Sequence, residues 1–216
     1  RKDRDPSGDA SQPPRILHVQ DRARVRDWAL RRNGGLLLGY DEVRRSARLG
    51  WEPYRAFTRP LEPWWIDWEA ALVRDDLEHA PAPLDIDATQ LAVLDRLAVN
   101  HIVTDVALGG AAAEAYAPAA TDGGLTRYQR REPVPRVFLT ARCLVEPQLP
   151  EGALARLTSV DARTVFLAAS SDACDPNGSA RAGPVAIQER QPGHWWIAVR
   201  NSEAAALLVL REAAVD

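Results

Sequence analysis

An aromatic stretch, residues 51–68 (WEPYRAFTRPLEPWWIDW), holds the side chains of this sequence that are best suited to bind a ligand. It contains four of the seven tryptophans, and its candidate binding residues are Trp51, Tyr54, Trp64, Trp65, Asp67 and Trp68. An indole ring stacks on the apolar face of a pyranose, while a neighbouring carboxylate accepts hydrogen bonds from sugar hydroxyls. The stretch is therefore a candidate carbohydrate-binding surface.

The same tryptophans also fit an ordinary protein core. At helical spacing, a helix over residues 65–78 would place one apolar stripe inward, formed by Trp65, Trp68, Ala71 and Leu72. We favour this second interpretation, because an aromatic stripe at this spacing is more often buried than used for binding.

Asp85 and Asp87 form an acidic pair, a residue type that holds divalent metal ions in nucleotide-sugar transferases. Gln90 follows Asp87 at the spacing of a capping box, in which the carboxylate and the glutamine side chain bond to each other's backbone N–H. The next apolar residues, Leu91, Leu94, Leu97 and Ala98, recur at helical spacing. We therefore favour a helix cap at Asp87 and expect no metal site.

The remaining reactive residues show no catalytic or metal-binding pattern. The four histidines are scattered, and no nucleophile elbow, zinc-binding, phosphate-loop or dinucleotide-binding motif is present. We predict no catalytic residue, no bound metal and no cofactor. Cys143 and Cys174 lack metal-ligand spacing; the favoured interpretation is two unpaired thiols, with a disulfide as the alternative in an oxidising compartment.

Composition limits the other function classes. The chain has 216 residues, 46% of them hydrophobic, and a formal charge of -3 with scattered arginines, so it can bury a core but presents no basic face for nucleic acid. Its apolar runs are too short to span a bilayer. The sequence lacks methionine and begins with a polar lead, residues 1–14, that we expect to be disordered. We expect a soluble piece of a longer protein.

Residues 15–131 predict a mixed α/β part. The expected elements are strands at 16–19, 36–38 and 101–104, helices at 21–32, 41–47 and 88–98, and a small-residue loop at 107–124 that includes a short helix at 111–116. Helices that alternate with strands indicate an α/β layer.

Residues 132–216 predict an antiparallel β-sandwich-like part, which makes the whole chain α+β. Strands are expected at 137–139, around Cys143 and at 164–169, and a meander of three strands at 185–190, 195–200 and 205–211. Pro135 and Arg136 mark the structural junction between the two parts, because prolines interrupt the strand pattern there. We expect Arg136 to bond carbonyls or a carboxylate at this corner.

Several ordered, weak motifs resemble the C-terminal extracytoplasmic region of the YfhO-like bacterial membrane proteins, which are related to GT-C glycosyltransferases. The matching segments are Arg15-Ile16-Leu17, Asn33 followed by Gly39-Tyr40-Asp41, Leu91 to Val103, Tyr128 with PVPRVF at 133–138, and ALLVLRE at 206–212. The sequence departs from the family at His101 and Val134. It also ends before the family's Pro-Gly-Trp turn, so we expect the sandwich-like part to be truncated.

The resemblance implies a membrane-attached parent that transfers sugar from a polyprenyl-phosphate donor outside the cytoplasm, with its catalytic carboxylate elsewhere. The implied partners of this piece are the parent's transmembrane domain and a glycan or polyprenyl-linked sugar. Two functions follow: an accessory domain that recognises an acceptor glycan, or a structural module that packs on a membrane domain or partner without binding sugar. The second function predicts a large exposed apolar patch.

Overall fold

The computed structural model describes residues 15–19, 41–42, 56–64, 83–178, 185–191, 194–199 and 206–211. Contacts divide the chain into two compact units. The sheet unit comprises Pro14–Asp95 and Val99–Glu132, and the C-terminal unit includes Arg96–Ala98 and Pro133–Asp216. Helices and strands occur together, so the chain is α+β.

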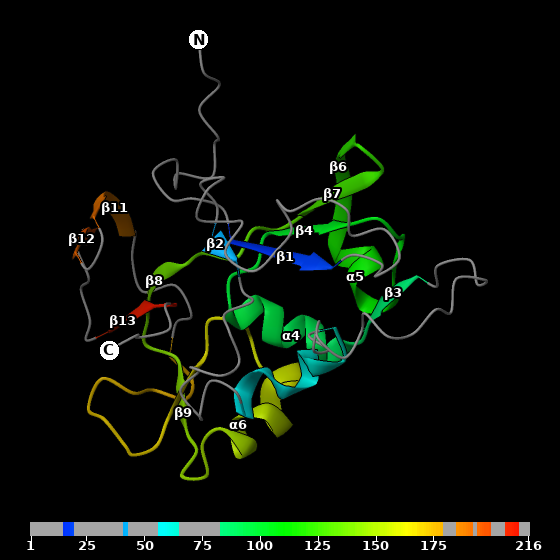
Figure 1. Ribbon diagram of the computed structural model, residues 1–216. Helices are drawn as coiled ribbons and strands as arrows, with labels where there is room; N and C mark the ends of the chain where they lie inside the picture. The colour runs from blue at the N-terminus through cyan, green and yellow to red at the C-terminus, as the bar shows by residue number, and fades with distance from the viewer. Residues whose placement is uncertain are drawn as a thin grey trace. The chain divides into compact units, whose positions relative to one another are not determined.

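The sheet unit is built on a five-stranded mixed sheet in the order β2-β1-β4-β7-β6 (Figure 1). Its strands are β1 (Arg15–Val19), β2 (Asp41–Glu42), β4 (His101–Thr104), β6 (Tyr116–Asp122) and β7 (Leu125–Arg130). β1 pairs in parallel with β2 and β4, and β7 pairs antiparallel with β4 and β6. The predicted strands at 16–19 and 101–104 are confirmed.

One face of this sheet forms a core. Leu17 lies opposite Ile102 in the parallel pair, and both side chains are fully buried. Tyr128 continues this row, since it lies opposite Ile102 on the other side. The next row is more polar, because His101 lies opposite the exposed Gln129. The alternation matches a strand with one face on the core.

The helix α4 (Ala88–Arg96) buries Val93 and Leu94, and it confirms the helix predicted after Asp87. It ends in a turn in which the Val99 N–H donates to the Leu94 carbonyl and Ala98 adopts a φ of 53°. This is the pattern of a Schellman cap, with alanine in the place that glycine usually fills. The helix predicted at 41–47 does not begin at Asp41, because Asp41 and Glu42 form β2; residues 43–47 lie outside the described residues.

Two short parallel strands, β3 (Leu84–Ile86) and β5 (Leu108–Gly109), pair beside α5 (Gly110–Ala115). The loop expected at 107–124 is wrong on both sides of α5, because β5 precedes α5 and β6 begins at Tyr116. Gly123 and Gly124, with φ of 56° and 84°, connect Asp122 to its partner Leu125. Two residues at positive φ are the signature of a tight hairpin, and the Gly-Gly pair is its signal in the sequence.

The C-terminal unit contains three two-stranded sheets among its described residues. β8 (Val137–Thr140) pairs antiparallel with β13 (Leu207–Leu210), and β11 (Val185–Gln191) pairs antiparallel with β12 (His194–Val199). The hairpin of the predicted meander is confirmed. The third strand, predicted at 205–211, is confirmed as β13, but its place in the meander is wrong, because β13 pairs with β8.

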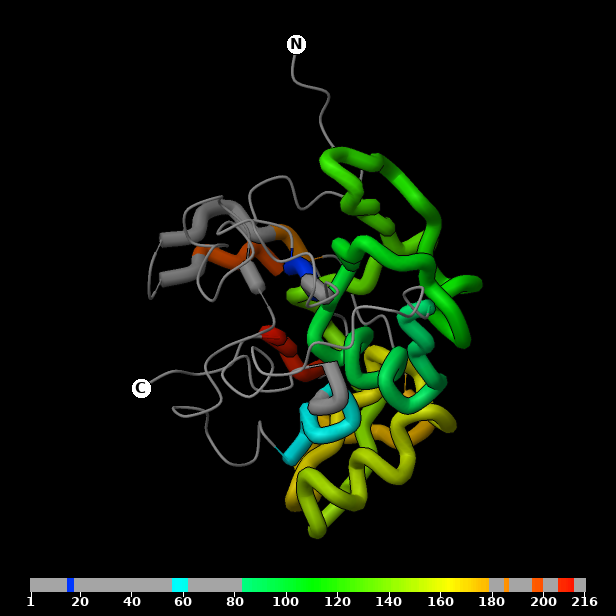
Figure 2. Tube along the Cα trace, turned by 45° about the vertical axis from the view of Figure 1, so that its right-hand side comes forward, coloured from blue at the N-terminus to red at the C-terminus, as the bar shows by residue number. Residues whose placement is uncertain are grey.

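The third sheet is parallel: β9 (Cys143–Val145) pairs with β10 (Val165–Leu167). Figure 2 shows this segment doubling back through α6 (Glu151–Arg156) and the 3-10 helix η4 (Leu157–Ser159). The expectation of a wholly antiparallel part is therefore wrong here. A crossover that contains a helix is long enough to return the chain in the same direction.

Several predicted features lie outside the described residues: the lead at 1–14, the helices at 21–32 and 65–78, and the strand at 36–38. Within the described ranges, no helix has both the length and the apolar character required to cross a membrane.

We predict that Gly110→Ala destabilises the sheet unit more than Gly123→Ala. The two glycines have nearly equal φ, 57° and 56°, so both substitutions carry the strain of a left-handed alanine. A Cβ at Gly110 would also meet the Asp85 carboxylate and come within 2.5 Å of the Ile86 carbonyl oxygen, whereas nothing lies within 4 Å at Gly123. Measured by urea unfolding, we expect Gly110→Ala to lower the free energy of unfolding by at least about 1 kcal/mol more than Gly123→Ala does. Equal losses in the two variants would contradict this packing.

Candidate functional site

The candidate carbohydrate surface lies mostly outside the described residues, which exclude Trp51, Tyr54, Trp65, Asp67 and Trp68. Trp64 is the last residue of the 3-10 helix η3 (Arg59–Trp64). Leu61 of this helix is fully buried, and the Gln90 side chain donates to the Pro60 carbonyl at 3.0 Å. η3 is therefore fixed against the start of α4, and sugar binding by the tryptophans stays a prediction.

Of the acidic pair Asp85 and Asp87, Asp87 forms the helix cap that the sequence predicts, and Asp85 lies in β3. The Gln90 N–H donates to Asp87 Oδ1 at 2.8 Å, and the Asp87 N–H donates to Gln90 Oε1 at 2.9 Å. These reciprocal bonds define a capping box. Among the residues that the structure describes, no group of three or more metal-ligating side chains is found.

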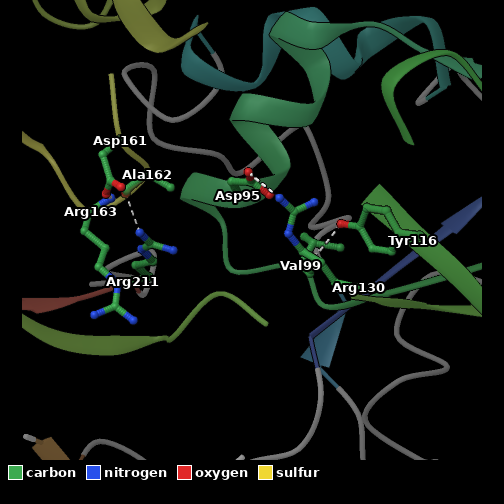
Figure 3. Close-up of polar contacts among 8 residues, drawn as sticks. All are labelled: Asp95, Val99, Tyr116, Arg130, Asp161, Ala162, Arg163 and Arg211. Atoms are coloured by element: carbon green, nitrogen blue, oxygen red, sulfur yellow. Dashed lines mark hydrogen bonds and ion pairs between the residues drawn. The ribbon is translucent and has the colours of Figure 1, made fainter. Parts of the chain in front are cut away.

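The best-defined polar cluster of the sheet unit joins Tyr116, Arg130 and Asp95 (Figure 3). The Tyr116 hydroxyl donates to the Val99 carbonyl at 2.7 Å, and the ring is almost completely buried. Arg130 Nη2 donates to Asp95 Oδ2 at 2.8 Å, and its guanidinium lies 5.4 Å from the centre of the Tyr116 ring. A salt bridge and a cation–π contact therefore meet on one arginine, and neither partner was identified from the sequence.

This cluster is suited to structure more than to catalysis. Burial raises the pKa of the Tyr116 phenol well above its ordinary value; the positive charge of Arg130 lowers it by less, and Asp95 raises it. The phenol therefore stays protonated and continues to donate to Val99. A tyrosine held in this state is neither a base nor a nucleophile at neutral pH.

A second polar cluster, in the C-terminal unit, consists of arginines that bond to backbone carbonyls. Arg211 Nη2 donates to the Ala162 carbonyl at 2.6 Å (Figure 3). Arg96 donates through Nη2 to the Asp161 carbonyl at 2.9 Å and through Nη1 to the Thr164 carbonyl. Two arginines far apart in sequence therefore hold one loop, residues 161–164, just before β10.

An aromatic ring lies beside this loop. The guanidinium of Arg211 is 4.7 Å from the centre of the Phe138 ring, and that of Arg163 is 5.9 Å from it. Both distances are in the range of cation–π contacts. Because Phe138 is buried in β8, the ring connects the loop to the β8–β13 sheet.

The predicted junction residue Arg136 is only 3% exposed, and its carbonyl accepts a 2.9 Å hydrogen bond from the Arg211 N–H. Pro135, the other predicted junction residue, precedes it at the entrance to β8. Arg136 therefore stands in the interior of the C-terminal unit beside the end of β13. This position fits a structural residue.

The cysteines form a disulfide, Cys143–Cys174, so the favoured expectation of two unpaired thiols is wrong. Backbone hydrogen bonds bring the segments around the two cysteines together. The Asp175 N–H donates to the Ala141 carbonyl at 3.0 Å, and Asp175 forms an isolated parallel β-bridge with Arg142. Asp175 Oδ1 also accepts from the Asn177 N–H at 2.9 Å, the bond of an Asx turn. Sequence spacing did not indicate this pairing, because Cys174 lies on a loop that only tertiary contacts align.

Exposed apolar side chains are the other notable feature of the C-terminal unit. The described large apolar residues that are exposed are Val145, Leu149, Trp196, Val199, Leu208 and Leu210. All six belong to this unit, whereas the described part of the sheet unit exposes none.

Comparisons with protein-family models, with curated proteins and with solved structures find no match. The resemblance to the YfhO-like family therefore stays a prediction, and the site must be judged on its own geometry.

We predict that Tyr116→Phe lowers the free energy of unfolding by about 1 to 2 kcal/mol, because it removes a buried hydrogen bond. The matched control is Tyr128→Phe, a half-buried tyrosine whose hydroxyl makes no hydrogen bond with the described residues, and it should change little.

Comparing wild type with Tyr116→Phe also tests the raised pKa of the Tyr116 phenol. Above pH 10 the unfolded chain loses the Tyr116 proton while the folded chain keeps it, so stability falls with rising pH by about 1.4 kcal/mol per unit for this residue. The difference in unfolding free energy between wild type and Tyr116→Phe should therefore shrink above pH 10. A constant difference would show that Tyr116 is not buried as described.

Proposed function

We propose that this chain is an extracytoplasmic, accessory module of a membrane protein, and that its C-terminal unit packs on the membrane domain of that protein. The observation that carries the proposal is the restriction of all described, exposed large apolar side chains to this unit. Exposed apolar patches on a folded domain mark interaction surfaces. Of the two functions expected from the sequence, this favours the packing module.

The packing surface is centred on β13. Leu208 lies opposite Leu139 and Leu210 opposite Val137, so the four side chains share one face of the β8–β13 pair. Leu139 and Val137 are buried, but Leu208 and Leu210 are 48% and 38% exposed. Every residue of β13 is apolar, so both of its faces carry apolar side chains. Such a strand is typically covered on both faces. We infer that the membrane domain covers the outer leucines.

The sandwich-like arrangement expected from the sequence belongs to the same proposal. The antiparallel pairs β8–β13 and β11–β12 supply its layers, and β11 contacts β8. A partner that covers Leu208 and Leu210 would complete the layer that these few strands leave open.

The disulfide supports the extracytoplasmic location. Protein disulfides form and persist in oxidising compartments and are rare in the reducing cytosol. Cys143 and Cys174 are joined, and the described part of the chain has no free cysteine. The proposed module therefore faces the periplasm or the cell surface.

The polar clusters support an accessory role. Tyr116 donates to Val99, Arg211 to Ala162, and Arg96 to the carbonyls of residues 161 and 164. Each of these side chains stabilises backbone. The parent's proposed sugar transfer then belongs to a site outside this chain.

We expect protein secreted to an oxidising compartment to show no free thiol when unfolded without reductant, and two thiols after reduction. The double variant Cys143→Ser with Cys174→Ser should be less stable by about 3 to 4 kcal/mol, since the bond closes a loop with a separation of 31 residues. Two reactive thiols in the unreduced, unfolded protein would contradict the proposed location.

The packing surface can be tested by photo-crosslinking in the complete gene product in its native membrane. A benzophenone amino acid at Leu208 should crosslink to membrane-spanning segments of the same polypeptide, identified by mass spectrometry. The control position is Arg127, an exposed residue of β7 in the sheet unit, which should give no such crosslink.

A crosslink from Leu208 only to a second copy of the chain, or none at all above the Arg127 background, would overturn the proposed packing on a membrane domain.

A further inference from the structure

The hydrogen bonds between β8 and β13 fix which residues of β13 face its outer edge. The Arg211 N–H donates to the Arg136 carbonyl at 2.9 Å, so these two residues form a hydrogen-bonded pair at the end of the ladder. Hydrogen-bonded and non-hydrogen-bonded pairs alternate along an antiparallel ladder. Val209 therefore bonds to β8, whereas the backbone N–H and C=O groups of Leu208 and Leu210 point away from it. Among the described strands β13 pairs with β8 alone, so this outer edge is open.

The outer edge of β13 lacks the features that usually protect an edge strand. β13 has the sequence LLVL and pairs with β8 without a register shift, so it carries no charge, proline or bulge. The outer strand β6 of the sheet unit shows the contrast, because it contains Pro118 and a register shift between Pro118 and Ala120. Prolines and bulges discourage the addition of another strand. The edge of β13 is therefore suited to accept one.

We propose that β13 pairs antiparallel with β13 of a second copy of this chain, around a two-fold axis at Val209. This axis places Leu208 opposite the second copy's Leu210, and Leu210 opposite the second copy's Leu208. Both residues direct their backbone groups to the open edge, so each pair can exchange two N–H···O=C bonds. A register displaced by one residue would place Leu208 opposite Val209, whose backbone groups already bond to β8.

The strand is complementary to itself in charge and in shape. The axis at Val209 places Arg211 of each copy opposite Leu207 of the other, so the two arginines lie at opposite ends of the paired strands and like charges do not meet. An axis at Leu208 or at Leu210 would instead leave one of these leucines opposite a residue outside β13. The register at Val209 therefore pairs both exposed leucines with each other.

Pairing would turn two small sheets into one. The joined sheet has the order β8-β13-β13-β8, in which both copies of β13 are interior strands. Three or more strands with an apolar face can form a stable sheet, whereas a two-stranded sheet is marginal. The contact goes beyond the packing proposed above, because it uses the edge of β13 and leaves the face with Leu208 and Leu210 available to a membrane domain.

Single cysteines test the register directly. Val209→Cys would lie opposite itself in a non-hydrogen-bonded pair with Cα atoms about 4.5 Å apart, a separation that a disulfide spans. Leu208→Cys would lie diagonally from its counterpart, at about 7 to 8 Å, which is too far. Under mild oxidation of the whole chain, we expect the covalent dimer to form at least about tenfold faster with Val209→Cys. The two native cysteines are already paired and do not compete.

Sedimentation of the unmodified chain measures the dimer itself. One short strand buries little surface, so we expect a weak dimer with a dissociation constant of about 10 µM to 1 mM. Leu208→Pro removes an N–H that faces the second strand, whereas the matched control Leu208→Ala keeps it. We expect Leu208→Pro to weaken the dimer at least about tenfold more than Leu208→Ala does. Their melting temperatures should be similar, because a proline is tolerated where the N–H faces solvent.

Each result decides the proposal. Faster crosslinking of Val209→Cys than of Leu208→Cys supports it, and so does a dimer that Leu208→Pro disrupts while the variant stays folded. If Leu208→Pro does not fold, the comparison of the two cysteine variants decides. Equal crosslinking rates, a chain that is monomeric at every concentration up to about 1 mM, or a dimer that withstands Leu208→Pro overturns the pairing.

The pairing and the proposed function can fail separately. A monomeric chain whose Leu208 still crosslinks to a membrane domain would remove only the pairing of β13 with itself. A dimer in the predicted register, with no crosslink from Leu208 to a membrane domain, would remove only the proposed packing on that domain.

Discussion

The C-terminal unit depends on one physical constraint: its described strands pair only two at a time. A two-stranded sheet has no interior strand, so it buries little apolar surface and cannot hold itself together in water. Three kinds of crosslink compensate in this unit. The Cys143–Cys174 disulfide fixes a loop to β9, arginines bond to the carbonyls of residues 161–164, and the Phe138 ring lies against two guanidinium groups.

The same constraint explains the exposed apolar side chains. Neighbouring residues of β13 point to opposite faces of the sheet, so its apolar side chains lie on both faces. With only two strands in the sheet, Leu208 and Leu210 stay exposed beside the buried Val137 and Leu139. The sheet unit shows the contrast, because its five strands bury Leu17 and Ile102 completely. A unit that is stabilised by crosslinks and exposes Leu208 and Leu210 is well suited to bury these side chains against a partner surface.

Local sequence rules predicted features that depend on neighbouring residues. The capping box at Asp87 and Gln90, the strand at His101–Thr104 and the hairpin of β11 with β12 follow from spacing alone. Features that depend on distant residues were missed. The disulfide, the pairing of β13 with β8 and the meeting of Tyr116 with Arg130 arise from tertiary contacts that no periodicity encodes. The candidate packing surface could be predicted as a class of surface, but its position on Leu208 and Leu210 required the structure.

The central claim is that β13 of the C-terminal unit is covered in the native protein. Hydrogen–deuterium exchange, compared between the isolated chain and the membrane protein that we propose as its parent, tests it most directly. We expect slower amide exchange in β13 in the membrane, with unchanged exchange in β4 of the sheet unit, which is already internal to its sheet. Equal exchange of β13 in both settings would contradict the account.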